Sequence, residues 1–174
     1  MREGDRGKGA AAPATPTRRE NSLSAPGDGE GRGEGRGVHN YTLEDNIGFI
    51  LRQATQRHLA IFAALMTDDL TPTQFSALVK LAEYGPCSQN RLGRLTSMDP
   101  PTIKGVIDRL TRRGLTRTGP APDDARLLVV ALTEAGRAVV TRAIPCAKRI
   151  TEATLAPLAP ARRHELIALL KALR

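Results

Sequence analysis

Two adjacent stretches of the sequence concentrate cationic side chains in patterns that could bind a polyanion. In residues 99–114, DPPTIKGVIDRLTRRG, apolar residues recur at helical spacing, which leaves Lys104 and Arg112 outside the apolar stripe. Residues 115–136, LTRTGPAPDDARLLVVALTEAG, alternate between apolar and polar side chains around a polar turn beside Arg126. A cationic helix next to a protruding cationic hairpin can enter the major groove of DNA and reach the adjacent minor groove. The pattern therefore predicts binding to double-stranded DNA.

The sequence contains no motif that would support catalysis. G-x-S-x-G, the P-loop, G-x-G-x-x-G, H-E-x-x-H and paired carboxylates are all absent from it. His39, His58 and His164 fall in unrelated segments, and Cys87 and Cys146 belong to no C-x-x-C or Cys/His cluster. We expect no enzymatic activity, no metal and no cofactor.

The net charge of +8 and the pI near 10.3 also favour a polyanionic partner. Residues 1–40 hold seven Lys or Arg and six Asp or Glu, so residues 41–174 carry a net charge of +7. Aromatic residues make up 3% of the chain and Trp is absent, so the core must consist of Leu, Ile, Val and Ala, which suits helices.

The chain has no apolar run near the length of about 18 residues that a membrane span needs. Its first residues also lack the hydrophobic segment of a secretory signal. We expect no membrane contact and a cytoplasmic location.

Periodicity and capping residues predict the order of the elements. Residues 1–38, rich in Gly, Pro, Arg and Glu, are expected to be a disordered tail, either inert or a basic arm that contacts DNA. Thr71, Ser88, Asp99 and Thr133 are the expected helix N-caps. The predicted elements are helices over about 42–66, 72–84, 89–96, 100–113, 134–158 (kinked at Pro145) and 160–173, and hairpin strands over 115–118 and 127–132.

This order predicts a mainly α-helical fold with a small β-wing, in which a winged helix-turn-helix is flanked by long N- and C-terminal dimerisation helices. We expect one domain over residues 39–174, with a DNA-binding lobe at about 70–133 and dimerisation helices at about 43–66 and 133–173. The outer helices carry more apolar residues than the lobe could cover, which indicates an interface. A two-fold homodimer would bury them and set two reading helices about one DNA turn apart, as an inverted-repeat operator requires.

Three stretches together resemble the MarR family of transcriptional regulators: LTPTQFSALVKL, SQNRLGRLTSMDPPTIKGVIDRLTRRGLTRT and DDARLLVVALTEAGR. The resemblance runs from about residue 43 to residue 173. Its most specific part is the wing, where Asp-x-Arg is followed by alternating apolar residues and L-T-x-x-G. Family membership implies a ligand-responsive homodimeric repressor.

The resemblance also implies which residues contact DNA. Pro101, Thr102 and Lys104 would face the bases, and Ser88, Gln89 and Arg91 would face phosphates. Arg126 takes the place of the arginine that enters the minor groove, and Asp124 that of the acid that orients it. Many relatives have a second arginine where this chain has Ala125, which implies weaker binding by the wing. Arg112 and Arg113 could contact phosphates or complement the dipole of their helix.

A small effector, commonly a phenolic or aromatic carboxylate, is also implied. Arg52, Gln56 and His58 are the candidate ligands, because an arginine with nearby polar groups can hold a carboxylate in a mostly apolar site. Arg52 and His58 could instead make structural contacts or lie in solvent. The segment is similar to members that control aromatic-acid catabolism and respond to aromatic acids or their coenzyme A thioesters. A redox switch at Cys87 or Cys146 is the other sensing option, although both suit packing better.

Two other functions compete with an effector-controlled regulator. A basic dimer could coat DNA as a non-specific architectural protein without an effector. A protein–protein adaptor could also keep a winged-helix shape, but it would not need Lys104 and Arg126 to face outward. Preference for an inverted repeat separates the regulator from the architectural protein, and an adaptor would show no salt-dependent DNA binding.

Overall fold

A computed structural model describes residues 41–121, 124 and 126–173. The chain divides into two units, Met1–Tyr41 and Thr42–Arg174, and the second contains every element described below. The expected tail of residues 1–38 lies outside the described residues, and so does Ala125, where many relatives have an arginine.

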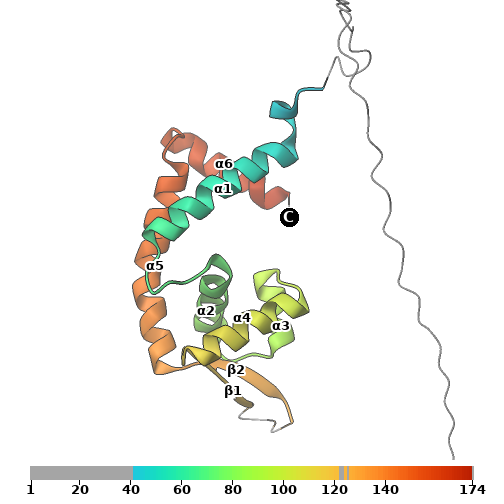
Figure 1. Ribbon diagram of the computed structural model, residues 1–174, viewed down its shortest axis with the longest axis vertical. Coiled ribbons are helices and arrows are strands. Elements are labelled where there is room, and N and C mark those ends of the chain that lie inside the picture. Colours follow the sequence, from blue (N-terminus) through green and yellow to red (C-terminus); the bar gives the residue numbers. More distant parts are fainter. Residues whose placement is uncertain (1–40, 122–123, 125, 174) are drawn as a thin grey trace, which may run out of the picture. The chain divides into compact units, whose positions relative to one another are not determined.

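The second unit is mainly helical with one two-stranded hairpin, so the predicted fold class is confirmed (Figure 1). A short 3-10 helix, η1, precedes six α-helices. The elements are η1 (Leu43–Asp45), α1 (Ile47–Leu65), α2 (Pro72–Tyr84), α3 (Gln89–Thr96), α4 (Pro100–Arg112), β1 (Thr116–Pro120), β2 (Leu128–Leu132), α5 (Glu134–Leu155) and α6 (Pro160–Ala172). The strands pair antiparallel, with Thr116 opposite Leu132 and Pro120 opposite Leu128.

The four predicted N-caps are confirmed, because each cap side chain accepts the backbone N–H of the third residue after it. Thr71 caps α2, Ser88 caps α3, Asp99 caps α4 and Thr133 caps α5. Each bond satisfies a donor that the first turn of a helix otherwise leaves unpaired, and a lost cap of this kind costs about 1 kcal/mol. The polar residue before each apolar stripe therefore fixes where the helix begins.

Several boundaries differ from the sequence prediction. The first helix begins at Ile47 rather than near Thr42, because the Asn46 side chain accepts the Phe49 N–H at 3.0 Å and starts the helix there. The fifth helix continues through Pro145 to Leu155 as one element. The strands also begin and end one or two residues later than predicted at three of their four ends.

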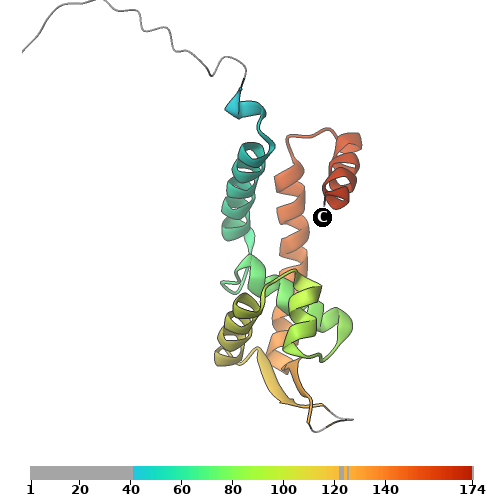
Figure 2. The same cartoon turned by 90° about the vertical axis from the view of Figure 1, so that its right-hand side faces the viewer.

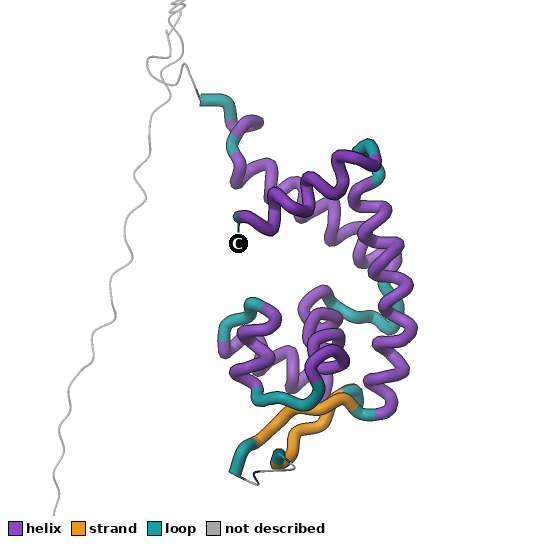
Figure 3. Tube along the Cα trace, turned by 180° about the vertical axis from the view of Figure 1, so that it is seen from behind, coloured by secondary structure: helices purple, strands orange, loops and turns teal. Residues whose placement is uncertain are grey.

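One hydrophobic core joins α2, α3, α4, the hairpin and the N-terminal part of α5. Helix α4 contributes one complete face to it, since four of its apolar residues are at most 5% exposed: Ile103, Val106, Ile107 and Leu110. A short bridge in which Cys87 and Val130 exchange two backbone hydrogen bonds ties the segment before α3 to the hairpin. The strands lie at the end of the lobe, beside the N-terminal end of α5 (Figure 3).

The start of α5 packs directly against the end of the segment that leads into β1. The Thr133 N–H donates to the Leu115 carbonyl at 3.1 Å, and the Thr133 hydroxyl donates to the Gly114 carbonyl at 2.7 Å. Gly136 is buried in the first turn of α5, and a Cβ at this position would overlap the carbonyl oxygen of Leu115. Only glycine lets the two backbones approach this closely.

The turn between α1 and α2 receives arginines from two other helices. Arg142 of α5 donates to both carboxylate oxygens of Asp68, at 2.6 and 3.3 Å. This bond holds the pKa of the Asp68 carboxyl below its usual range. Arg113, at the end of α4, donates to the backbone carbonyls of Asp68 and Asp69 at 2.5 and 3.4 Å. Both aspartates have positive φ, which is uncommon outside glycine, so the turn holds them in a specific conformation.

Helix α1 runs along the C-terminal half of α5 (Figure 2). Arg57 donates to the Ala153 and Thr154 carbonyls at 3.0 and 2.6 Å, and so pairs carbonyls in the last turn of α5. The described chain nevertheless leaves much apolar surface of α1 and α6 exposed. Phe62 is the one buried residue of α1, and α6 has none.

Replacing Gly136 with Ala should lower the free energy of unfolding by about 1–3 kcal/mol, because the methyl group overlaps the Leu115 carbonyl and the packing must shift. Gly119→Ala is the matched control, since no atom lies within 4 Å of a Cβ there, and it should stay within about 0.5 kcal/mol. Urea denaturation measures both. A Gly136→Ala protein as stable as the unmodified chain would contradict the close contact.

Replacing Asp68 with Asn should reduce the loss of unfolding free energy that the protein shows as the pH falls. A carboxyl whose pKa is lower in the folded state stabilises the fold above its unfolded pKa of about 3.9, and this stabilisation is lost as the pH falls through the folded pKa. At neutral pH, Asp68→Asn should cost about 1 kcal/mol, because Arg142 is half exposed.

The control for this change is Asp69→Asn at the adjacent position, which also has positive φ but lies outside the ion pair. Unfolding in urea at pH 7, 5 and 3 gives the pH dependence of each variant. Identical pH profiles for Asp68→Asn and Asp69→Asn would show that the ion pair with Arg142 does not act as described.

Candidate nucleic-acid interface

Burial of one face of α4 leaves its other face to solvent. Pro101, Thr102 and Lys104 are all exposed, as are Asp108 and Arg112 further along the helix. All three residues that the sequence analysis assigned to base contact therefore lie at one accessible end of α4. The structure places them where a DNA groove could reach them.

Thr102 already takes part in the cap of α4. Its backbone N–H donates to Asp99 Oδ1 at 2.8 Å and its hydroxyl donates to Asp99 Oδ2 at 2.9 Å. These two bonds stabilise the carboxylate, so they hold the pKa of Asp99 below its usual range. Because the hydroxyl proton is engaged, Thr102 can offer a base only acceptor lone pairs or its methyl group without breaking the cap.

Lys104 forms an ion pair with Asp108 one turn later, with Nζ 2.8 Å from Oδ2. Both side chains are more than half exposed, and such pairs typically contribute less than about 1 kcal/mol. The ammonium group has three donors, of which Asp108 takes one in this geometry. The pair therefore holds the lysine at the surface of α4 and leaves it able to contact a second acceptor.

The residues of α3 differ in exposure. Ser88 is half-buried as the cap, accepting the Arg91 N–H at 3.3 Å, and Gln89 is also half-buried. Arg91 is exposed. Of the two arginines at the end of α4, Arg112 is exposed, whereas Arg113 binds the turn between α1 and α2. Arg113 therefore has a role that neither of the two sequence interpretations included.

The described residues of the hairpin turn hold a highly exposed arginine. The side chain of Arg126 is 95% exposed, and its Nε lies 3.5 Å from Asp124 Oδ1. The same oxygen accepts the Arg126 backbone N–H at 2.9 Å. Asp124 thus bonds the arginine through one oxygen rather than through the two-pronged contact that the sequence analysis described. The rest of the guanidinium group is free to bind another acceptor.

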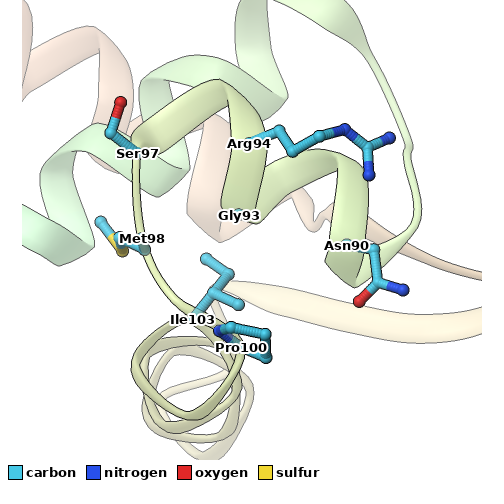
Figure 4. A pocket seen from close by; sticks show the side chains of 7 residues that line it. All are labelled: Asn90, Gly93, Arg94, Ser97, Met98, Pro100 and Ile103. Atoms are coloured by element: carbon cyan, nitrogen blue, oxygen red, sulfur yellow. The ribbon is translucent and has the colours of Figure 1, made fainter. Parts of the chain in front are cut away.

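A cavity of about 350 Å³ lies where α3 crosses the start of α4 (Figure 4). The crossing is close because a Cβ on Gly93 would lie 3.1 Å from the Met98 carbonyl oxygen. Ser97, with φ of 53°, makes the turn between the helices. Asn90 and Arg94 of α3 lie on one side of the cavity (Figure 4). Neither residue is among the predicted DNA contacts, because their position at the cavity depends on how the two helices cross.

The three candidate effector residues do not form one cluster within the chain. Arg52 lies over the Phe49 ring, with its guanidinium carbon 5.1 Å from the ring centroid. Gln56 is exposed one turn later. His58 Nδ1 lies 3.0 Å from the Thr154 hydroxyl of α5, which is a contact within the chain. His58 lies on a different face of α1 from Gln56, because two residues along a helix correspond to a rotation of about 200°.

Both cysteines are free and buried. Burial raises the pKa of the Cys87 thiol, which disfavours the thiolate that oxidation requires. Cys146 is 8% exposed, and its sulfur accepts a contact from Arg149 at 3.4 Å. Both positions agree with the interpretation as packing residues.

Comparisons with known proteins agree with this geometry. The MarR family pattern matches residues 70–128. The HTH-type transcriptional repressor NicR of Pseudomonas putida is 39% identical over 132 residues, which cover 75% of this chain and 84% of NicR. The chain belongs to the MarR family. It is therefore a transcriptional repressor of the MarR type.

Solved structures of MarR-type regulators match the described fold. A probable transcriptional regulator from Pseudomonas aeruginosa is 51% identical, with a TM-score of 0.74 over 76% of this chain and all of that one. BpsR of Bordetella bronchiseptica, whose DNA binding is regulated by 6-hydroxynicotinic acid, is 38% identical, with a TM-score of 0.72 over 76% of this chain and 96% of BpsR.

None of the helices in the described residues is both long and apolar enough to cross a membrane. No group of three or more His, Cys, Asp or Glu residues in this part of the chain could hold a metal ion.

Proposed function

We propose that this MarR-family protein is a homodimer that binds an inverted-repeat operator and is released by a small aromatic acid or its coenzyme A thioester. The observation that carries the proposal is that one lobe presents both an exposed polar and cationic face of α4 and, on its hairpin, the exposed Arg126. Two such surfaces read separate grooves of one duplex.

The homodimer rests on apolar side chains that the described part of the chain leaves uncovered. They gather on η1, α1 and α6: Leu43, Ile47, Ile50, Leu51, Leu59, Leu169, Leu170 and Leu173, with exposures from 42% to 72%. So many exposed apolar residues on helices with so few buried ones favour a second copy of the chain as their cover. A two-fold axis through these helices gives the two lobes the symmetry of an inverted repeat.

The DNA contacts divide into positioning and reading. Ser88, Gln89, Arg91 and Arg112 fix the lobe on phosphates, which sets the register but carries no sequence information. Pro101, Thr102 and Lys104 face base edges from α4, and Arg126, oriented by Asp124, enters the minor groove. Binding that covers a promoter then prevents transcription.

The effector site is proposed at α1, with Arg52, Gln56 and His58 as its polar groups. Support comes from the position of Arg52 beside an aromatic ring and from BpsR, which responds to an aromatic carboxylate. His58 lies on a different face of α1 from Arg52 and Gln56, so the three groups of one chain cannot surround one ligand. The site is complete only where a second chain covers α1 and contributes its own residues. The alternative function, a non-specific architectural protein without an effector, predicts no response to any aromatic acid.

Operator binding distinguishes the two functions and tests the wing. The intergenic DNA beside the protein's own gene is the first candidate, and an inverted repeat within it should bind about a thousandfold more tightly than random DNA of the same length. Arg126→Ala should weaken operator binding about tenfold to a hundredfold and reduce the salt dependence by about two units of slope, about one for each chain of the dimer.

Fluorescence anisotropy over a range of salt concentrations gives both quantities. Asp124→Ala keeps the arginine and removes its anchor, so it should lower affinity less than Arg126→Ala. Arg149→Ala removes the same charge from α5 and should leave affinity within about threefold. Equal affinities for operator and random DNA would favour the architectural function, and unchanged affinity in Arg126→Ala would remove the wing from the mechanism.

Aromatic acids added to the operator complex test the effector proposal. At saturating concentration, 6-hydroxynicotinic acid or another member of a panel of aromatic acids and thioesters should lower operator affinity about tenfold. Arg52→Gln should keep operator affinity and lose this response, because the carboxylate loses its cationic partner. Gln53→Ala, the next residue of the same helix, is the control. A response that survives Arg52→Gln would place the effector elsewhere.

A further inference from the structure

A second cavity, of about 270 Å³, lies at the root of the wing. We call it the wing-root cavity. Its walls come from the end of α2, the turn that follows it, both strands and the start of α5. Its lining includes Leu81, Pro86, Arg117, Ala131 and Arg137.

Two arginines line the wing-root cavity without a carboxylate partner. Arg117 of β1 and Arg137 of α5 are both exposed, and among the described residues neither guanidinium forms an ion pair or a side-chain hydrogen bond. Glu83 is close in sequence to residues that line the cavity, such as Leu81, but its carboxylate is paired with Lys80 at 2.7 Å. Two like charges that line one small cavity repel each other unless an anion lies between them.

Other arginine-lined hollows of the protein differ in this respect. In the hollow beside α6, Arg162 lies 3.1 Å from Glu165, so its charge is already compensated. In the cavity between α3 and α4, Arg94 is accompanied by the neutral amide of Asn90. Of these three sites, the wing-root cavity alone combines two uncompensated cations with apolar walls.

We propose that the wing-root cavity binds a small organic anion, a carboxylate or a phosphate ester with a compact apolar group. The two guanidinium groups hold the oxyanion with charge-assisted hydrogen bonds, and the apolar group packs on Leu81, Pro86 and Ala131. The volume is slightly below the range of about 300–1,000 Å³ typical of drug-sized ligands, so the cavity suits a smaller molecule, about the size of benzoate. A DNA phosphate would use the charge and leave the apolar walls unused.

An anion at this position connects elements that position the DNA-binding surface. It bridges β1 to α5, and its apolar wall includes Pro86, two residues before the cap of α3. Binding there therefore favours one placement of the wing relative to α5. The site is separate from the α1 effector site and does not depend on it.

The proposal is tested by titrating the full chain with sodium benzoate. Binding is followed through the arginine Nε–Hε signals in ¹H–¹⁵N NMR spectra. The signals of Arg117 and Arg137 should shift together and saturate. Arg117→Gln and Arg137→Gln should each raise the dissociation constant about tenfold or more, because each removes one charged donor. Arg162→Gln, beside the compensated hollow of α6, should change it less than twofold. The Arg52 signal reports separately on any binding at α1.

DNA binding by the same variants separates a small anion from a backbone phosphate. Under the proposal, the Arg117→Gln and Arg137→Gln variants bind DNA with dissociation constants within about threefold of that of the unmodified chain. If each instead lowers the salt slope by about two units, about one for each chain of the dimer, and benzoate does not shift either signal, the site holds DNA and the proposal is wrong. Benzoate shifts that are absent, or that are unchanged in both variants, also overturn it.

Discussion

The burial of one face of α4 is the constraint on which the described structure depends. Four side chains on this face are packed inside the lobe and are at most 5% exposed: Ile103, Val106, Ile107 and Leu110. The helix therefore cannot rotate about its axis without exposing them. Burying an aliphatic side chain of this size contributes about 1.5–3 kcal/mol, so the face as a whole outweighs every surface ion pair nearby. The orientation of Lys104 and Arg112 toward solvent follows from this packing rather than from their own bonds.

The fixed helix is connected to the long helix α5 by two routes. At the start of α5, Gly136 lets this helix contact the Leu115 carbonyl, next to the end of α4. Further along α5, Arg142 binds the turn at Asp68, which Arg113 at the end of α4 also binds, so α4 and α5 share one support. A change in the position of α5 therefore reaches α4 through backbone contacts and not through flexible side chains alone. This is the kind of connection by which an effector at the outer helices can alter a DNA-binding surface.

Local sequence signals predicted the parts of the structure that local interactions determine. The caps at Thr71, Ser88, Asp99 and Thr133 and the stripe of α4 follow from spacings of three and four residues, and all are confirmed. The same signals predicted the order of the elements, and family resemblance added the roles expected of individual residues such as Lys104 and Arg126.

Contacts between distant segments could not be predicted in the same way. Arg113 binds a turn 44 and 45 residues earlier, and His58 contacts a hydroxyl 96 residues later. Their partners are known only once the helices are packed. The wing-root cavity has no sequence signal for the same reason, because Arg117 and Arg137 meet only where β1 and α5 converge. Asn46 was a missed local signal, since an Asn before an apolar run is a common cap.

The proposed function requires that two copies of the described lobe bind one duplex through symmetric α4 and wing surfaces. Hydroxyl-radical footprinting of the bound operator, combined with the stoichiometry from sedimentation, tests it most directly. The account predicts two chains per duplex and protection related by a dyad, with half-sites about 10 base pairs apart and added protection of the flanking minor grooves. One chain per duplex, or uniform protection without a dyad, would contradict it.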